Sequence, residues 1–308
     1  MDDFSKLVEE ANYIDAQSFR RLINQTYQIL SEEKDYFGKS QIIGRLILMP
    51  PSGEATVIGD IHGDIDSLKH TLIESKFIQK ASNRNETYLI FLGDYGDRGP
   101  YSPEVYYVVL SLKNMFPDKV VLIQGNHEGP EDLLASPHDL PYHLQRKFSV
   151  EWRIVYKELS QLFRRFYIAV LVDQRCIMLH GGAPSKAKNL EDIANAYEKH
   201  PAESHLEEIL WSDPIENFVG THPSPRGAGN LFGEDVTKSF LKMLKVRFMI
   251  RGHEATECGY KIEHDGGILT LFSRKGPPYF NRYAAYLTFN LSQIFDSAWQ
   301  LEPFIHKF

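Results

Sequence analysis

Five apolar segments of this sequence end in a short polar block flanked by glycine, and this repeated pattern is the strongest constraint on the fold. The segments lie at 55–58, 87–92, 119–123, 167–179 and 246–250, and the fourth of them is predicted to be two strands around a turn. The blocks that follow them read GDIHGD, GDYGDRG, QGNHE, HGG and RGHE. Apolar runs that stop at glycine are typical of buried strands. Because ligand sites of α/β proteins form beyond the carboxyl ends of strands, the blocks are expected to converge on one site.

Segments in which apolar residues have helical spacing lie before and between the first predicted strands. The predicted helices lie at 3–34, as one or two helices, at 64–78, at 102–116 and over most of 131–166. Two late stretches, 260–273 and 283–291, predict antiparallel strands. The order predicts an α/β fold in one large domain, or in one domain with an N-terminal appendage.

Composition excludes several classes of protein. The chain has 308 residues, of which 43% are hydrophobic, and a formal net charge of -7, which argues against non-specific nucleic-acid binding. No apolar run approaches the roughly 20 residues that span a bilayer. The acidic N-terminus does not fit a secretory signal, and two cysteines, Cys176 and Cys258, cannot build a disulfide framework. We therefore expect a cytoplasmic protein without nucleic-acid or membrane partners.

The polar blocks contain side chains that bind metal ions through oxygen or imidazole nitrogen. They are Asp60, His62, Asp94, Asn126, His180 and His253. A donor set without thiolate suits Mn, Fe or Zn better than Ca or Mg. Six ligands exceed the need of one tetrahedral ion and match two ions that share a carboxylate. Gly59 and Gly63 are expected to let the backbone approach the ions closely.

Each of these residues also has a structural explanation when it is taken alone. Asp60 or Asp94 could cap a turn, and Asn126 could adopt a turn conformation. His180 could be a hydrogen-bonded core histidine. Coincidence at all five strand ends is the weaker explanation, so a metal site is the leading interpretation. The remaining histidines, His138 among them, lie outside the blocks and are predicted to be structural or at the surface.

The five blocks, in this order, resemble the motifs of the metallophosphoesterases. The similarity is greatest to the serine/threonine phosphoprotein phosphatase family of the type 1/type 2A group, and LWSDP (210–214), SPRGAGNLFG (224–233) and LTLFS (269–273) also resemble segments of that family. The resemblance implies a metallophosphoesterase fold, which is a central β-sandwich flanked by helices. We expect an N-terminal helical segment at 1–45, which carries none of these motifs, and a catalytic domain at 46–308.

The resemblance also implies two divalent or trivalent metal ions per chain. Carried over, Asp60 and His62 belong to the first ion, and Asp94 bridges both. The second ion is assigned to Asn126, His180 and His253. Mn is expected to activate the protein in vitro. A water shared by two ions loses a proton near neutral pH and so supplies hydroxide for direct attack on phosphorus.

Four further residues match the family's active-site positions: Asp97, Arg98, His127 and Arg226. His127 is the candidate general acid, because a serine or threonine alkoxide is a poor leaving group, and Asp97 would accept its other ring proton. Arg98 and Arg226, with Asn126, would bind the phosphate, since guanidinium matches phosphate oxygens in bidentate geometry. Taken alone, Asp97 and Arg98 could form a structural ion pair, and Arg226 could be a solvated loop residue.

The implied activity is hydrolysis of phosphoserine and phosphothreonine in proteins, so phosphorylated proteins are the expected partners. The alternative within enzymes is a dinuclear hydrolase of diadenosine polyphosphates or small phosphomonoesters, which LWSDP and SPRGAG disfavour. A phosphodiesterase or nuclease typically has Gly-His-X-His where this chain has Gly252-His253-Glu254-Ala255. An inactive scaffold that binds phosphoproteins usually lacks a ligand or the acid, and none is lost here.

The sequence departs from the family at three places. Gly96 stands where valine is usual, and Gln124 stands where arginine is usual. The loop at 274–283 replaces the usual pattern, so that either Tyr279 or Tyr283 could be the active-site tyrosine. The chain ends without an obvious regulatory tail, from which we expect a minimal catalytic unit; the sequence identifies no regulatory subunit.

Overall fold

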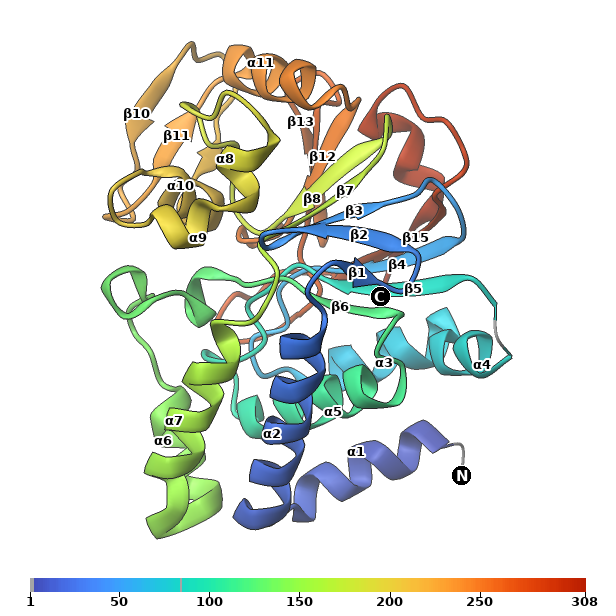
Figure 1. Cartoon of the computed structure of the whole chain (residues 1–308), viewed down its shortest axis with the longest axis vertical. Helices are drawn as coiled ribbons and strands as arrows, with labels where there is room; N and C mark the ends of the chain where they lie inside the picture. Colours follow the sequence, from blue (N-terminus) through green and yellow to red (C-terminus); the bar gives the residue numbers. More distant parts are fainter. Residues whose placement is uncertain (1–2, 84) are drawn as a thin grey trace.

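The computed structural model describes residues 3–83 and 85–308. Within these ranges, the centre of the molecule is a sandwich of two β-sheets with helices on both outer sides (Figure 1). The predicted α/β class and the central sandwich are confirmed.

The larger sheet contains eight strands of the described chain, in the order β1-β2-β3-β7-β8-β12-β14-β13. They are β1 (Tyr36–Phe37), β2 (Ser40–Ile43), β3 (Leu46–Met49), β7 (Ala169–Val172), β8 (Cys176–Leu179), β12 (Phe248–Arg251), β13 (Tyr260–Glu263) and β14 (Ile268–Leu271). The smaller sheet has five described strands in the order β16-β15-β4-β5-β6. They are β4 (Glu54–Ile58), β5 (Thr87–Phe91), β6 (Val120–Leu122), β15 (Ala285–Asn290) and β16 (Ile305–Lys307). A short third sheet is formed by β9 (Asp213–Pro214), β10 (Thr221–Pro223) and β11 (Asn230–Phe232).

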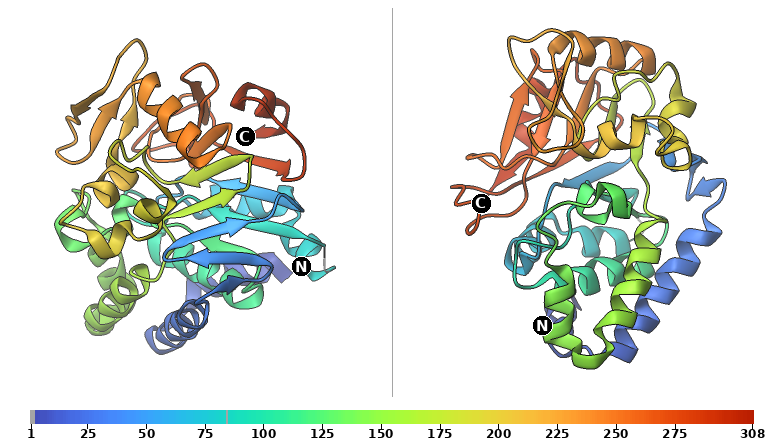
Figure 2. Two further views of the ribbon diagram at one scale, coloured as in Figure 1. Left: turned by 45° about the horizontal axis from the view of Figure 1, so that its top comes forward. Right: turned by 90° about the vertical axis from the view of Figure 1, so that its left-hand side faces the viewer.

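Helices cover the two outer faces of the sandwich (Figure 2). On the side of the smaller sheet lie α1 (Asp3–Tyr13), α2 (Ala16–Glu32), α3 (Ile65–Ser75), α4 (Phe77–Ser82), α5 (Ser102–Met115), α6 (Leu140–Phe148) and α7 (Trp152–Phe163). On the side of the larger sheet lie α8 (Leu190–Ala194), α9 (Ala196–Lys199), α10 (His205–Trp211) and α11 (Glu234–Leu244). None of the described helices is both long and apolar enough to cross a membrane.

Strands β7, β8, β12 and β14 of the larger sheet are buried on both faces, because successive side chains point to opposite sides and both sides are covered. In β8, Cys176 and Met178 join the core cluster that includes the smaller sheet. Ile177 and Leu179 join a second cluster beneath α8–α11. Two-sided burial therefore explains why this strand is a continuous apolar run in the sequence.

The N-terminal helices pack against the same core. α2 lies against α5 and α7, with the side chain of Phe19 fully buried. The fully buried Lys113 ammonium of α5 donates to Glu33, just beyond α2, at 2.6 Å. The helical part of residues 1–45 ends at Glu32, and β1 and β2 then enter the larger sheet. The division of the chain at residue 45 stays a prediction.

The strands that precede the five polar blocks run parallel and end at one edge of the sandwich. β4, β5 and β6 are parallel neighbours in the smaller sheet, and β8 and β12 are parallel neighbours in the larger one. A bridge between Asp60 and Phe272 joins the two sheets at this edge. The blocks therefore come together from both layers of the sandwich.

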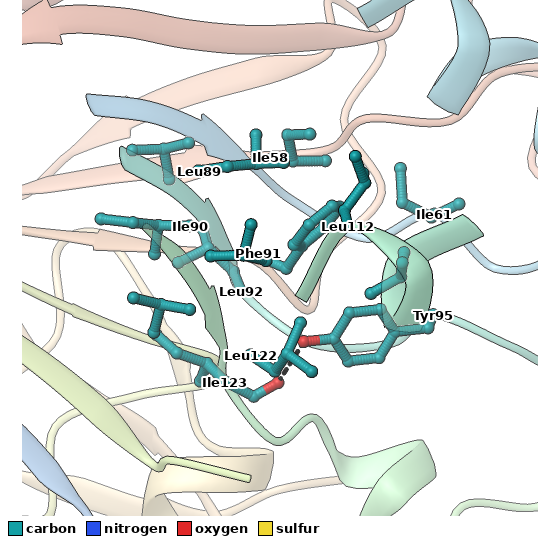
Figure 3. Packing of buried hydrophobic residues seen from close by; sticks show 14 of the residues in the cluster. Ile58, Ile61, Leu89, Ile90, Phe91, Leu92, Tyr95, Leu112, Leu122 and Ile123 are labelled. Atoms are coloured by element: carbon teal, nitrogen blue, oxygen red, sulfur yellow. Dashed lines mark hydrogen bonds between the residues drawn. The ribbon is translucent and has the colours of Figure 1, made fainter. Parts of the chain in front are cut away.

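Apolar packing behind the blocks holds these strand ends in place (Figure 3). Ile58, Phe91 and Leu122 are buried where β4, β5 and β6 stop. Tyr95, inside the second block, is also fully buried, and its hydroxyl donates to the Ile123 carbonyl at 2.9 Å. The loop that carries the block is thus anchored in the core.

Candidate active site

A cleft of about 700 Å³ opens where the blocks meet. Its lining includes residues from four of the five blocks, namely His62, Asp94, Arg98, Asn126, His127 and His253. Asp60 and His180 lie behind them, almost fully buried. The structure brings together every site residue that the sequence analysis named.

His62 points one ring nitrogen at the site. Its Nδ1 lies 2.9 Å from the Gly96 carbonyl oxygen, which can only accept, so Nδ1 carries the proton. The lone pair of Nε2 then faces two carboxylates, at 3.4 Å from Asp94 Oδ2 and 3.8 Å from Asp60 Oδ2. A partner that holds the other nitrogen in this way is usual for metal-binding histidines.

His180 is oriented by the same device. Its Nδ1 donates to the Leu92 carbonyl at 2.9 Å, and its Nε2 lies 3.4 Å from Asp94 Oδ1. The Asn126 amide group lies 2.9 Å from His180 Nε2 and 3.2 Å from His253 Nδ1. The two oxygens of Asp94 therefore face two separate groups of ligands, one with His62 and one with His180.

These atoms fit cations between them. Acceptor atoms face one another across the site, and the buried Asp60 Oδ2 has no hydrogen-bond partner among the described residues. Burial raises the pKa of Asp60 to about 7, and burial together with Asp60 raises that of Asp94 well above its ordinary value. Burial also lowers the pKa values of His62, His180 and His253. Uncompensated carboxylates beside neutral imidazoles are the arrangement that bound metal ions stabilise.

Several site residues adopt left-handed backbone conformations that residues other than glycine rarely take. The φ angles are 44° at His62, 55° at Asp94, 63° at Asp97, 68° at Arg98 and 73° at His253. Such conformations cost free energy and concentrate at functional sites. The turns are thus held by their surroundings to present these side chains.

Gly59 and Gly63 both lie against other backbone, and a Cβ at Gly63 would lie 2.6 Å from the Gly99 carbonyl oxygen. Their expected close approach to metal ions stays a prediction. A Cβ at Gly59 would lie 2.2 Å from the Leu271 carbonyl oxygen, so this glycine lets β4 pass close to β14. Gly125 and Gly252 make room for the carboxylates of Asp94 and Asp60. A Cβ there would lie 2.1 Å from Asp94 Oδ1 and 2.5 Å from Asp60 Oδ1.

His127 and Asp97 form a close pair beside these groups. His127 Nδ1 lies 2.6 Å from Asp97 Oδ2, and Nε2 lies 4.0 Å from Asp94 Oδ2 at the cleft. Asp97 is 1% exposed. Burial by itself raises the pKa of Asp97, but hydrogen bonds from His127 and His138 outweigh it and lower the pKa. Asp97 is therefore a carboxylate that holds the Nδ1 proton of His127 and leaves Nε2 facing the cleft.

Two arginines from distant segments line the cleft. Arg98 follows Asp97 directly, and its backbone N–H donates to Asp139 Oδ1 at 3.0 Å. Arg226 is 2.6 Å from Asp213 Oδ2, and the fully buried Arg251 pairs with the other oxygen of Asp213 at 2.7 Å. Asp213 thus positions Arg226 against the cleft.

The open choice between two tyrosines has a geometric answer. Tyr279 lines the cleft, and its ring stacks on His62 with 5.6 Å between ring centroids. Tyr283 is not among the residues that line the cleft, and its ring lies near Arg282 and Lys307. The almost fully buried Arg274 donates to the His62 carbonyl at 2.9 Å, which ties the loop of Tyr279 to the first block.

Gly96 and Gln124, the two departures inside the blocks, belong to one packing arrangement. A Cβ at Gly96 would lie 2.7 Å from the Tyr106 ring, whose hydroxyl donates to Glu128 Oε1 at 2.6 Å. Glu128 Oε2 accepts from the Asp94 backbone N–H at 2.9 Å, and Gln124 donates to the Glu128 carbonyl at 2.7 Å. Neutral donors therefore hold Glu128, and Glu128 holds the loop that carries Asp94.

The sequence analysis gave no role at the site to Asp213, Trp211, Arg274 or His138, and predicted His138 to be structural or at the surface. Asp213 and Trp211 lie within the LWSDP motif, so the signal for them was present. Trp211 lines the cleft and packs edge-on against His253. No local pattern marks Arg274 or His138, since each reaches the site only through the fold.

Comparison with known proteins agrees with this geometry. Residues 55–257 match the Metallophos family, the calcineurin-like phosphoesterases. The chain belongs to this family. Membership implies divalent metal ions, which the ligand clusters around the shared Asp94 fit.

Individual relatives are similar over much of the chain. A probable serine/threonine-protein phosphatase of Encephalitozoon cuniculi is 35% identical over 241 residues, which are 77% of this chain and 50% of that protein. The chain thus spans half the length of this curated relative.

Two solved structures share the fold. One is a protein serine/threonine phosphatase from Saccharomyces cerevisiae with similarity to human phosphatase PP5, at a TM-score of 0.71, 23% identity and coverage of 90% of this chain and 83% of that chain. The other is a cold-active protein tyrosine phosphatase, at a TM-score of 0.59, 18% identity and coverage of 80% and 76%.

Proposed function

We propose that this protein hydrolyses phosphoserine and phosphothreonine phosphomonoesters in proteins. The proposal is supported by the 35% identity to a probable serine/threonine-protein phosphatase and by the cleft in which Arg98, Arg226 and His127 surround the ligand cluster. The single observation that carries the proposal is the contact of His127 Nδ1 with Asp97, which leaves His127 Nε2 facing the cleft. A proton donor at this place is what departure of a serine or threonine alkoxide requires.

The residues of the chain divide the reaction between them. Arg98 and Arg226 bind the phosphate oxygens and orient the ester. Water adds to phosphorus as the P–O bond to the leaving group breaks, and the proton that this water loses passes to solvent. His127 donates its Nε2 proton to the departing oxygen, which leaves as an alcohol. Asp97 keeps Nδ1 protonated and stabilises the imidazolium before the transfer, and solvent afterwards returns a proton to Nε2.

Metal binding completes the proposed site. Asp60 and His62 would hold one ion, and Asp94 would bridge to a second. The second ion would be held by Asn126, His180 and His253. Bound ions supply an activated water and neutralise phosphate charge. We propose Mn, Fe or Zn, with Mn as the ion that activates the protein in vitro, because the donors are carboxylate, amide and imidazole.

The substrate class is tested by measuring kcat/KM of purified protein, reloaded with Mn, for four substrates. These are phosphoserine and phosphothreonine peptides, a phosphotyrosine peptide of matched sequence, and a dinucleoside polyphosphate. The proposal expects the first two to be hydrolysed with the highest kcat/KM. Preferential turnover of the dinucleotide would establish the alternative hydrolase, and preference for phosphotyrosine would contradict the leaving group proposed here.

The general acid is tested by His127→Asn. We expect both metal ions to remain bound and turnover of phosphoserine peptide to fall by about 100- to 10,000-fold, with a smaller loss on p-nitrophenyl phosphate, whose leaving group needs less protonation. Metal content, measured by elemental analysis, is the control. Loss of metal in this variant would mean that His127 is a ligand rather than the acid.

We also propose that the protein acts in the cytoplasm on phosphorylated proteins. Both cysteines, Cys176 and Cys258, are free, as is usual in a reducing compartment. Fractionation of cells that express the tagged chain would test this location.

A further inference from the structure

The Asp97 carboxylate accepts hydrogen bonds from three donors besides His127. Its Oδ1 accepts from the backbone N–H groups of Asp139 and Leu140, at 2.9 and 2.6 Å. Its Oδ2 lies 2.6 Å from His127 Nδ1 and 2.7 Å from His138 Nδ1. Three of these four donors come from residues 138–140, more than 40 positions further along the chain.

His127 and His138 share one carboxylate oxygen, and this contact determines which nitrogen of each ring carries the proton. Because the Asp97 carboxylate only accepts, His127 and His138 must both present a protonated Nδ1 to it. His138 Nε2 lies 2.9 Å from the hydroxyl of Tyr156, on α7, so that both of its nitrogens are engaged. Its side chain is 14% exposed. His138 is therefore held from both sides, with its orientation set by α7.

We infer that His138 is a positioning residue for the general acid His127, acting through the Asp97 carboxylate that both rings share. The inference rests on the proposed function, because it concerns the proton that His127 donates. Charge-assisted hydrogen bonds at this length restrict the rotation of the carboxylate. Without His138, Oδ1 keeps its two backbone donors but Oδ2 keeps His127 as its one donor. The carboxylate can then turn about its Oδ1 side, and the His127 ring can tilt with it away from the leaving oxygen. Misplacement of a reacting group by about 1 Å can cost about 100-fold in rate.

The same contacts are compatible with a purely structural role, in which His138 only ties the segment before α6 to α7. The two roles differ in what they predict for the leaving group. A residue that aims the acid matters most when the leaving group needs protonation. A residue that only stabilises the fold affects all substrates alike.

The main experiment compares His138→Leu and His138→Asn, both with normal metal loading. On phosphoserine peptide, we expect His138→Leu to lower kcat by about 10- to 100-fold with KM changed by less than about twofold. On p-nitrophenyl phosphate we expect a loss of about threefold or less. His138→Asn places an amide N–H near the position of Nδ1, so it should recover most of the peptide activity. His70→Leu, at an exposed histidine on α3 whose ring stacks on Phe308, is the matched control and should retain full activity.

Chemical rescue gives an independent readout. A cavity of about 480 Å³ is lined by His138, Tyr156 and the exposed Lys157, among other residues. Imidazole can therefore reach the space that His138→Ala vacates. We expect added imidazole to restore kcat of this variant in a saturable manner and to leave His70→Ala unchanged. The rescue compares the same folded variant with and without imidazole, so differences in folding between two variants do not enter the comparison.

A double variant tests whether His138 acts through His127. In the His127→Asn background, we expect His138→Leu to lower kcat by less than about twofold, because the acid is already absent. Equal losses on both substrates, a loss in KM alone, failure of both imidazole and His138→Asn to restore activity, or a full further loss in the double variant would each overturn the inference.

Failure of the proposed function would be distinguishable from failure of the inference. If wild-type protein hydrolyses aryl phosphates but no phosphopeptide, the proposed protein phosphatase activity is wrong. The His138 variants can still be compared on phenyl phosphate and p-nitrophenyl phosphate, which differ in how much protonation the leaving group needs. Loss confined to phenyl phosphate would then sustain the role of His138.

Discussion

Replacing Gly96 by alanine is predicted to destabilise the protein although the site is a loop. The φ angle of Gly96 is not in the left-handed region, so the backbone conformation does not require glycine here. Glycine is required because a larger residue would collide with the Tyr106 ring. The added Cβ would lie 2.7 Å from Tyr106 Cε2 and 3.2 Å from the Tyr106 hydroxyl oxygen. Carbon atoms in ordinary contact lie about 3.5–4.0 Å apart, so the ring must move.

The Tyr106 ring has little freedom to move. It is 1% exposed and packs against Tyr95 and Phe163, with ring centroids 5.9 and 5.2 Å away. Its hydroxyl donates to Glu128 Oε1 at 2.6 Å. Overpacking in a core costs about 1–3 kcal/mol, and loss of a hydrogen bond to a charged group costs about 1.5–3 kcal/mol. Gly→Ala lowers the entropy of the unfolded chain, which offsets about 0.4–1 kcal/mol.

We therefore expect Gly96→Ala to lower the free energy of unfolding by about 2–4 kcal/mol, and Gly96→Val to lower it further. The assay is equilibrium unfolding in urea, followed by circular dichroism, on protein freed of metal with chelator. The matched comparison repeats Gly96→Ala in a Tyr106→Leu background, where the edge of the ring is gone. There the cost should fall by at least about 1 kcal/mol. A cost within about 0.5 kcal/mol of zero, or an equal cost in both backgrounds, would refute the steric explanation.

Two further predictions concern the metal-binding and proton-donating groups. Asp94→Asn should weaken binding of both metal ions together, because the two oxygens of Asp94 face His62 and His180 separately; isothermal titration with Mn that shows loss of one ion alone would contradict a bridging role. Asp97→Asn should lower the free energy of unfolding at neutral pH, and the difference from wild type should shrink as the pH falls. The pKa of Asp97 is lowered in the folded state, so its contribution is complete above the unfolded value of about 3.9 and is lost as the pH falls through the folded value. Urea unfolding of metal-free protein between neutral and acidic pH measures this, and a constant difference would contradict it.

Local patterns made much of the fold predictable. β4, β5, β6, β8 and β12 all appear where apolar runs end in polar blocks. Helix α3 begins after Asp64, whose side chain accepts from the Ser67 N–H as an N-cap. Such features are encoded within a few residues, since strand alternation, caps and glycine turns need no distant partner. The candidate ligands followed because they directly succeed the strands.

Contacts between residues far apart in the sequence could not be predicted from local patterns. His138 lies 41 positions from Asp97, and the segment between them includes α5 and β6. The choice of Tyr279 over Tyr283 depends on how Arg274 binds the backbone of His62. Gly96 is explained by a ring ten positions later, on the far side of a turn. None of these pairs shares a local signal.

The sequence by itself determined the donor atoms, the strands that deliver them and the family of the chain, because each block is a continuous stretch whose chemistry is local. Only the tertiary structure decided which atoms face one another. β4, β5 and β6 belong to one sheet, whereas β8 and β12 belong to the other, and packing of the two layers sets the distances between Asp94, His62 and His180. The contact of His138 with Asp97 and that of Tyr106 with Glu128 were likewise set by packing, since each joins side chains that are distant in the sequence.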